Sequence, residues 1–220
     1  MDNKLTLTPS DMTAIELKDS NYINNKGAKF YAPESYELSV EYYRLAAAMG
    51  NAHSISNLGY CYLYGRSIEA NTSLAVAYFK IAASKGDVDA AYKLGDIYSS
   101  DKWGLMDKEL SAYYYRMAVS FVISKDGELL ELAWLNELQA YPSLCFAMGR
   151  EMALGGDMNT DIESAYKFLK HAQLGYEKEL ANGSEMYRDS YEGVIKLISD
   201  PQFDGIRLRM EKLFDDEDDE

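Results

Sequence analysis

Apolar residues recur at the three- and four-residue spacing of a helix along most of the chain, and this pattern returns every 36 residues. The pair Leu58-Gly59 returns as Leu94-Gly95, and the pair Tyr78-Phe79 returns as Tyr114-Tyr115. A fixed period of this length is typical of a stacked repeat, in which each unit buries its apolar face against its neighbours. The sequence therefore predicts an array of small helical units rather than one globular core.

Each unit is expected to hold two helices joined by a loop. In the clearest unit the first helix is expected over 52–64, and Gly65 ends it. Thr72 or Ser73 then caps a second helix, which ends at Gly86. One unit is therefore predicted as helix, loop, helix and turn.

Two glycines lie inside predicted first helices, at Gly59 and Gly95. Glycine in a helix costs about 1 kcal/mol relative to alanine, so a compensating contact is expected. We expect the paired helix to approach closely at both positions. Leucine at either glycine should then destabilise the array far more than leucine at Asp87.

The period divides the chain into repeats, one interruption and two terminal parts. The predicted parts are an N-terminal cap with a degenerate first helix over 1–30, repeats over 31–122, a helical insertion over 123–140, a further repeat over 141–175, capping helices over 176–214, and an acidic disordered tail over 215–220. Terminal helices of this kind cover the apolar faces that the end repeats would otherwise expose.

The string from Ala91 to Tyr98 and the string from Ser111 to Ala118 resemble the Sel-one-like repeat, a relative of the tetratricopeptide repeat (TPR). The likeness covers about 31–122 and 141–175. It implies an all-α fold, an α-α superhelix or solenoid of antiparallel helix pairs of TPR-like type. It also implies a non-enzymatic scaffold or adaptor without a cofactor, which binds a protein or peptide partner.

In related arrays the first helix of each unit lines the concave side. Carried onto this chain, that placement assigns partner binding to exposed positions between the packed Leu-Gly pairs: His53, Ser56 and Tyr60 in the second unit, Asp89, Tyr92 and Asp96 in the third, and Ser143, Phe146 and Arg150 in the fourth. Aromatic residues mixed with acids suit a basic or extended peptide. The alternative is that the aromatic members simply pack against neighbouring helices.

The formal net charge is -14, and six acidic residues stand together in the final run 215–220. A negative balance opposes binding to nucleic acid and to anionic membrane surfaces, and the sequence has no basic patch that would override it. Basic or neutral protein partners are therefore expected. The oligomeric state does not follow from the sequence.

Residues for catalysis or metal binding are scarce. Only two histidines occur, His53 and His171, and neither lies in a metal-binding motif. Asp157, Asn159, Asp161 and Glu163 alternate as a calcium loop begins, but Phe168 stands where a bidentate glutamate is needed. We expect no metal and no cofactor, and two buried reduced thiols at Cys61 and Cys145. No secretory signal or membrane span is visible, so a cytoplasmic location is expected.

Two rival functions stay open. An acidic regulator or inhibitor would use negative charge to occupy a basic, nucleic-acid-binding site on its partner. An enzyme is the other rival, because a few relatives of the repeat are associated with β-lactam binding or hydrolysis. The sequence supplies no activated nucleophile for that chemistry, so the scaffold is the preferred hypothesis.

Overall fold

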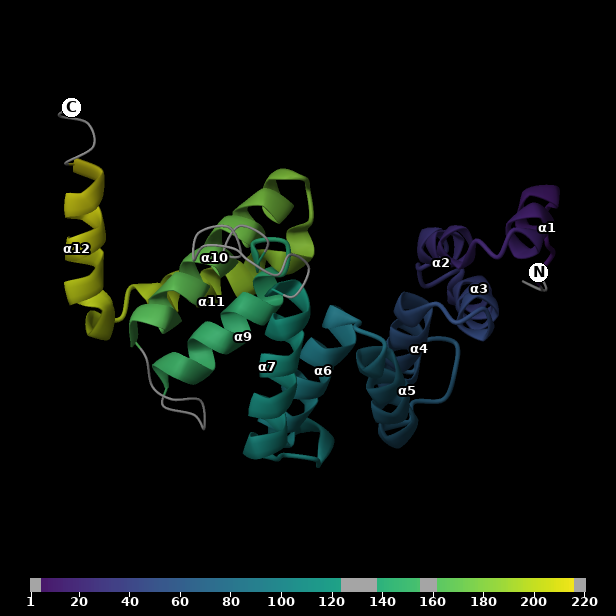
Figure 1. Cartoon of the computed structure of the whole chain (residues 1–220), viewed down its shortest axis with the longest axis horizontal. Helices are drawn as coiled ribbons and strands as arrows, with labels where there is room; N and C mark the ends of the chain where they lie inside the picture. Colours follow the sequence, from purple (N-terminus) through teal and green to yellow (C-terminus); the bar gives the residue numbers. More distant parts are fainter. Residues whose placement is uncertain (1–4, 124–137, 155–161, 216–220) are drawn as a thin grey trace. The chain divides into compact units, whose positions relative to one another are not determined.

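The computed structural model describes residues 5–123, 138–154 and 162–215, in two compact units that span 1–106 and 107–220. Within these ranges every regular element is a helix (Figure 1). Within each unit the two helices of a repeat pack side by side as an antiparallel pair. The chain therefore has the predicted all-α, α-α solenoid architecture of TPR-like type.

The first unit is built from paired helices in chain order. α2 pairs with α3 and α4 pairs with α5, while α3 also contacts α4 and α5 contacts α6. The elements are α1 (Pro9–Glu16), α2 (Ser20–Lys29), α3 (Tyr36–Ala48), α4 (Ala52–Tyr64), α5 (Thr72–Ser84), α6 (Val88–Ser99) and the 3-10 helix η1 (Asp101–Trp103).

The second unit centres on the pair α9 and α10, against which α7 and α11 pack. Its elements are α7 (Lys108–Ile123), α9 (Pro142–Ala153), α10 (Ile162–Ala181), η2 (Glu185–Tyr187), α11 (Arg188–Ile198), η3 (Pro201–Phe203) and α12 (Asp204–Asp215). Val194 and Phe203, which follow the last repeat, are fully buried, as expected of capping elements.

The boundaries of α4 follow from its flanking residues. The Asn51 side chain accepts a 2.9 Å hydrogen bond from the Ser54 N–H, and Gly65 ends the helix in the left-handed conformation with φ 67°. α5 is capped by Asn71, whose Oδ1 accepts a 2.9 Å hydrogen bond from the Leu74 N–H. The predicted cap at Thr72 or Ser73 is therefore wrong, because asparagine takes the extended backbone of a cap at least as readily.

Close approach of the paired helix is confirmed at Gly59. A Cβ placed there would lie 2.8 Å from Cε1 of Phe79 on α5, a separation that real Cβ contacts essentially never show. Gly149 of α9 faces Leu169 of α10 in the same way, at 2.7 Å from its Cγ. Gly95 is buried within α6. Gly59 and Gly149 thus let large side chains of the second helix reach the backbone of the first, and close approach at Gly95 stays a prediction.

α1 is held on the first unit by a buried ion pair. The carboxylate of Asp11, which has no exposed surface, lies 2.5 Å from Nζ of Lys26 on α2. It also accepts hydrogen bonds from the Tyr42 hydroxyl at 3.1 Å and the Thr8 N–H at 2.7 Å. Each acceptor oxygen of the buried carboxylate therefore has a donor.

Some predicted parts fall outside the described residues. The insertion expected over 123–140 is described only at its ends, where Leu138 is buried. Residues 216–220 of the predicted tail are also outside, while α12 runs through Asp215. The domain boundaries remain predictions.

Candidate functional site

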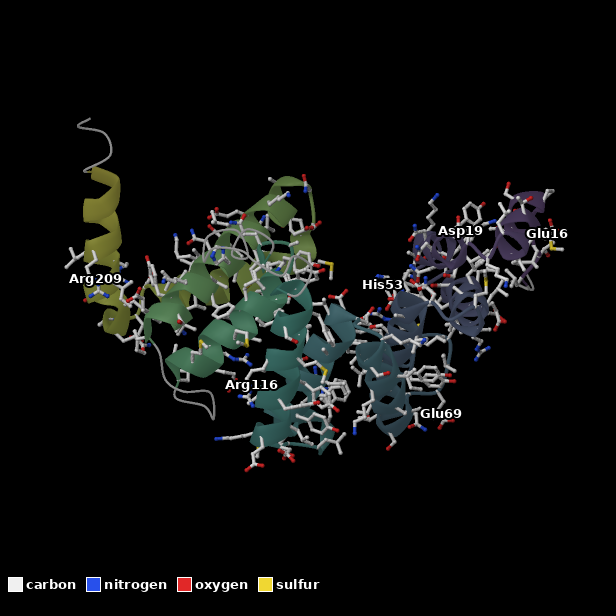
Figure 2. The ribbon with its side chains drawn as sticks, in the orientation of Figure 1. Glu16, Asp19, His53, Glu69, Arg116 and Arg209 are labelled. Carbon is white, nitrogen blue, oxygen red and sulfur yellow. The ribbon has the colours of Figure 1, made fainter. Side chains whose placement is uncertain are left out.

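The first helices of two successive repeats carry the predicted contact residues of the first unit. His53 and Tyr60 lie seven residues apart on one side of α4. Asp89 and Asp96 hold the equivalent positions of α6, 36 residues later. His53 lies at the beginning of α4 (Figure 2).

Asp87 links the N-terminal ends of the two helices. Oδ2 of this fully buried side chain lies 2.7 Å from Nδ1 of His53, whose own side chain is 66% exposed. Oδ1 of Asp87 accepts a 2.7 Å hydrogen bond from the Ala90 N–H and so caps α6. Leucine at position 87 would remove both contacts. Asp87 is therefore a poor reference position for the comparison with leucine at Gly59 or Gly95, because leucine should be costly there too.

Lys93 joins the aromatic and acidic side chains. Its ammonium lies 5.6 Å from the centre of the Tyr60 ring and 5.3 Å from that of Tyr92. It also donates a 2.8 Å hydrogen bond to Oδ2 of Asp96. These cation–π and ionic contacts compensate the burial of Lys93, which is only 8% exposed. Tyr60 in turn rests edge-to-face on Phe79, with ring centres 5.0 Å apart.

Negative charge is concentrated beside these rings. Desolvation by the neighbouring helices raises the pKa of Asp89, and the Asp87 carboxylate raises it further, while His53 and Lys93 act in the opposite direction. The pKa of Tyr60 is raised well above its usual range, first by burial and then by the Asp89 carboxylate. A positive charge brought to Asp89 would relieve this repulsion.

We call this set of side chains the α4–α6 surface. It consists of His53, Tyr60, Asp89, Tyr92, Lys93 and Asp96. Five of its six members are residues that the sequence assigned to partner binding.

Ser56 does not belong to the α4–α6 surface. It is 3% exposed, so the expectation that it is an exposed contact is wrong. Its position is about 60° around α4 from His53, on the side that turns inward. Tyr92 holds the equivalent position of α6 and remains half-buried, because a tyrosine ring reaches outward where a serine hydroxyl does not.

The predicted residues of the fourth repeat take part in packing within the second unit. The Tyr176 hydroxyl of α10 donates a 3.1 Å hydrogen bond to Oγ of Ser143. The Phe146 ring approaches Gly193 of α11 so closely that a Cβ there would lie 3.1 Å from it. Arg150 pairs with its neighbour Glu151 at 3.3 Å. The contact of Phe146 with α11 matches the alternative that the sequence left open for the aromatic members.

Sequence reasoning missed one member of the α4–α6 surface, Lys93, and also the residue that supports it from behind, Asp87. Asp87 immediately precedes α6, where aspartate is a capping signal. Lys93 is four residues after Asp89 and three before Asp96, the spacing at which opposite charges meet on a helix. Both signals were therefore present in the sequence.

Other candidate chemistry is weak. Nowhere in the described ranges do three or more His, Cys, Asp or Glu side chains gather as a metal site. His171 is half-buried on α10, and burial lowers its pKa. Residues 157–161 of the calcium-like sequence lie outside the described residues. No described helix combines the length and apolar character needed to cross a membrane.

A family model described as the Sel1 repeat matches residues 20–51, 52–87, 88–120 and 142–172. The first match includes α2, which lies in the segment 1–30 that was predicted as an N-terminal cap with a degenerate first helix. Sel1 repeats form non-catalytic helical scaffolds, and proteins that contain them generally serve in protein–protein interaction.

Solved structures of this class resemble the chain in fold. A Sel1 repeat protein from Oxalobacter formigenes is 20% identical, with a TM-score of 0.57 over 72% of this chain and 58% of that one. The protective antigen c5321 of uropathogenic Escherichia coli strains, described as displaying an SLR fold, is 17% identical, with a TM-score of 0.47 over 80% of this chain and 43% of that one. This chain therefore spans less than two thirds of either protein.

No curated protein matches the chain. The family model nevertheless covers more than half of its residues, and the matched segments coincide with successive helix pairs. The chain belongs to the Sel1 repeat family.

Proposed function

We propose that this protein is a non-enzymatic adaptor that holds a protein or peptide partner on the α4–α6 surface. The observation that carries the proposal is the meeting of two successive first helices through Tyr60, Tyr92 and Lys93 beside exposed acids. Half-exposed tyrosines held by their neighbours offer large contact area at little entropic cost. A rigid aromatic centre with a charged rim is the usual anatomy of a protein interface.

The partner is a basic or extended segment rather than an acidic one. Asp89 and Asp96 stand at the rim with Asp87 behind them, and Lys93 supplies the buried ammonium among them. The chain as a whole carries -14, which adds a long-range attraction for basic partners. The same charge disfavours nucleic acid and anionic membranes.

The test compares capture from the native cell extract by the wild type and by the double variant Tyr60→Ala, Tyr92→Ala. A matched control, Tyr22→Ala with Tyr113→Ala, removes two exposed tyrosines that lie elsewhere. Circular dichroism establishes that both variants are folded. A partner retained by wild type and control but lost by the Tyr60 and Tyr92 variant supports the proposal.

Two results would count against this assignment. If the wild type, the Tyr60 and Tyr92 variant and the control all capture the partner equally, the α4–α6 surface does not take part in recognition. Loss of the partner on deletion of residues 215–220, with steep weakening by salt, would favour the acidic regulator instead.

A further inference from the structure

A second aromatic cluster surrounds Arg66, immediately after α4. The guanidinium carbon lies 4.6 Å from the ring centre of Tyr31, 5.1 Å from that of Tyr64 and 5.5 Å from that of Tyr36. The next residue, Ser67, takes the left-handed φ of 52°, which L side chains adopt at a cost of about 1 kcal/mol. The loop therefore holds Arg66 against the rings despite this local cost.

Arg66 has no carboxylate within ion-pair distance among the described residues. Burial lowers its pKa, and no neighbouring acid offsets that effect. This is notable in a chain with 36 acidic and 22 basic residues. Tyrosine rings cover the face of a stacked guanidinium and leave its N–H edge to bind a carboxylate with two parallel hydrogen bonds.

An unbroken series of side chains connects Arg66 to the α4–α6 surface. Tyr64 lies under Arg66 and stacks on Tyr60, with ring centres 6.3 Å apart. Trp103 meets Tyr64 edge-to-face at 6.0 Å. Tyr60 then reaches Lys93 at 5.6 Å. Because Tyr64 is 43% exposed, this aromatic strip presents accessible surface at the C-terminal end of α4.

Opposite charges lie toward the two ends of α4. Asp89 lies near His53 at the beginning of α4, and Arg66 lies over Tyr64, the last residue of the helix. The eleven helical steps from His53 to Tyr64 correspond to about 17 Å at a rise of about 1.5 Å per residue. An extended peptide covers that distance in about five residues.

Resting on the function proposed above, we infer that the partner presents one extended segment with a basic and an acidic residue about five positions apart. The basic residue docks at Asp89, and the acidic residue pairs with the guanidinium edge of Arg66. Apolar residues between them pack on Tyr60 and Tyr64. This charge pair fixes the register of the segment, which the aromatic strip by itself would leave free.

The test is selection of a displayed library of random dodecapeptides against the full chain, followed by affinity measurement of the enriched peptides. The variants are Arg66→Glu and Asp89→Lys. Matched controls are Arg116→Glu and Glu16→Lys, which reverse charges at exposed positions outside the strip (Figure 2).

We expect enriched peptides to share the spaced pair of opposite charges. Arg66→Glu should weaken them about tenfold or more, while the controls leave affinity unchanged. A peptide whose acidic residue is replaced by lysine should regain affinity for Arg66→Glu. This rescue separates lost pairing from a folding defect, because a misfolded variant cannot gain affinity.

The outcomes separate the two proposals. Peptides that need Tyr60 and Tyr92 but ignore both charge reversals would overturn the inference and leave the proposed function standing. Peptides that bind the Tyr60→Ala, Tyr92→Ala variant as well as the wild type would overturn the proposed function. A selection that enriches no binding sequence would count against both.

Discussion

Gly59→Ala tests whether close helix approach is the reason for glycine inside α4. The added Cβ would lie 2.8 Å from Cε1 and 2.9 Å from Cδ1 of Phe79. Phe79 is fully buried and Tyr60 rests on its ring, so the ring cannot turn aside without moving the α4–α6 surface. Overpacking of this kind costs about 1–3 kcal/mol, and the better helix propensity of alanine returns about 1 kcal/mol. We expect a net loss of about 1 kcal/mol for alanine and of about 3 kcal/mol for leucine.

The assay is urea unfolding followed by helical circular dichroism, with the free energy of unfolding as the measured quantity. Gly205→Ala is the matched control, because a Cβ on this glycine of α12 meets nothing within 4 Å. That control should leave the free energy of unfolding unchanged or raise it slightly. A loss confined to Gly59→Ala would then reflect the contact and not the residue type.

A double-mutant cycle isolates the contact itself. Phe79→Leu removes the ring that Gly59→Ala would strike, so the alanine should cost less in that background, with a coupling energy of about 1 kcal/mol. If Gly59→Ala is as stable as the wild type and shows no coupling, the ring yields freely. Close approach would then not explain the glycine.

Two further predictions follow from buried titratable groups. Burial acts to raise the pKa of Asp11, but hydrogen bonds led by that from Lys26 outweigh it and lower the pKa below 3.8. The carboxylate therefore stabilises the fold above its ordinary pKa, and the contribution is lost as the pH falls through the lower folded value. Asp11→Asn should cost about 2 kcal/mol in urea unfolding at neutral pH, and equal stability to the exposed control Glu16→Gln would contradict this. Burial also raises the pKa of Cys61 to about 11 and of Cys145 to about 12, so both thiols should resist a thiol-specific reagent at mildly alkaline pH until urea unfolds the chain. Rapid labelling of either thiol in the native protein would show that it is not buried as described.

The repeat architecture could be predicted because its signals are local. Gly65 ends α4 where the sequence placed the end, and the Leu58-Gly59 pair marks the buried face of the same helix. The cap of α5 was misassigned within a run of three residues that can all serve as caps, 71–73. Boundaries of this kind depend on which polar side chain meets the free N–H groups, and a period cannot decide that.

α2 matches the repeat pattern only weakly because its contact with α4 is polar, although its Ile23 packs in the apolar core against Tyr42 and Ala46 of α3. Oδ1 of Asn24 accepts hydrogen bonds from Oγ of Ser54 at 2.7 Å and from Nδ2 of Asn57 at 3.1 Å. Nδ2 of Asn51 donates to Oδ1 of Asn21 at 2.8 Å. Apolar periodicity does not register positions whose contacts are hydrogen bonds, so the sequence predicts the opening helix of the first repeat only as degenerate.

The candidate site could be predicted only in part, because helical periodicity fixes the angle of a residue but not the reach of its side chain or what covers it. Ser56 and Tyr92 share one repeat position, yet only the longer side chain stays partly exposed. Tyr60 and Phe146 are both aromatic and lie on first helices, but α11 packs over Phe146, while Tyr60 remains beside Asp89. In the repeat next to the capping helices, this face of the first helix therefore packs within the fold. On the α4–α6 surface the side chains of His53 and Asp89 remain exposed within the first unit, and this is the physical reason to test recognition there first.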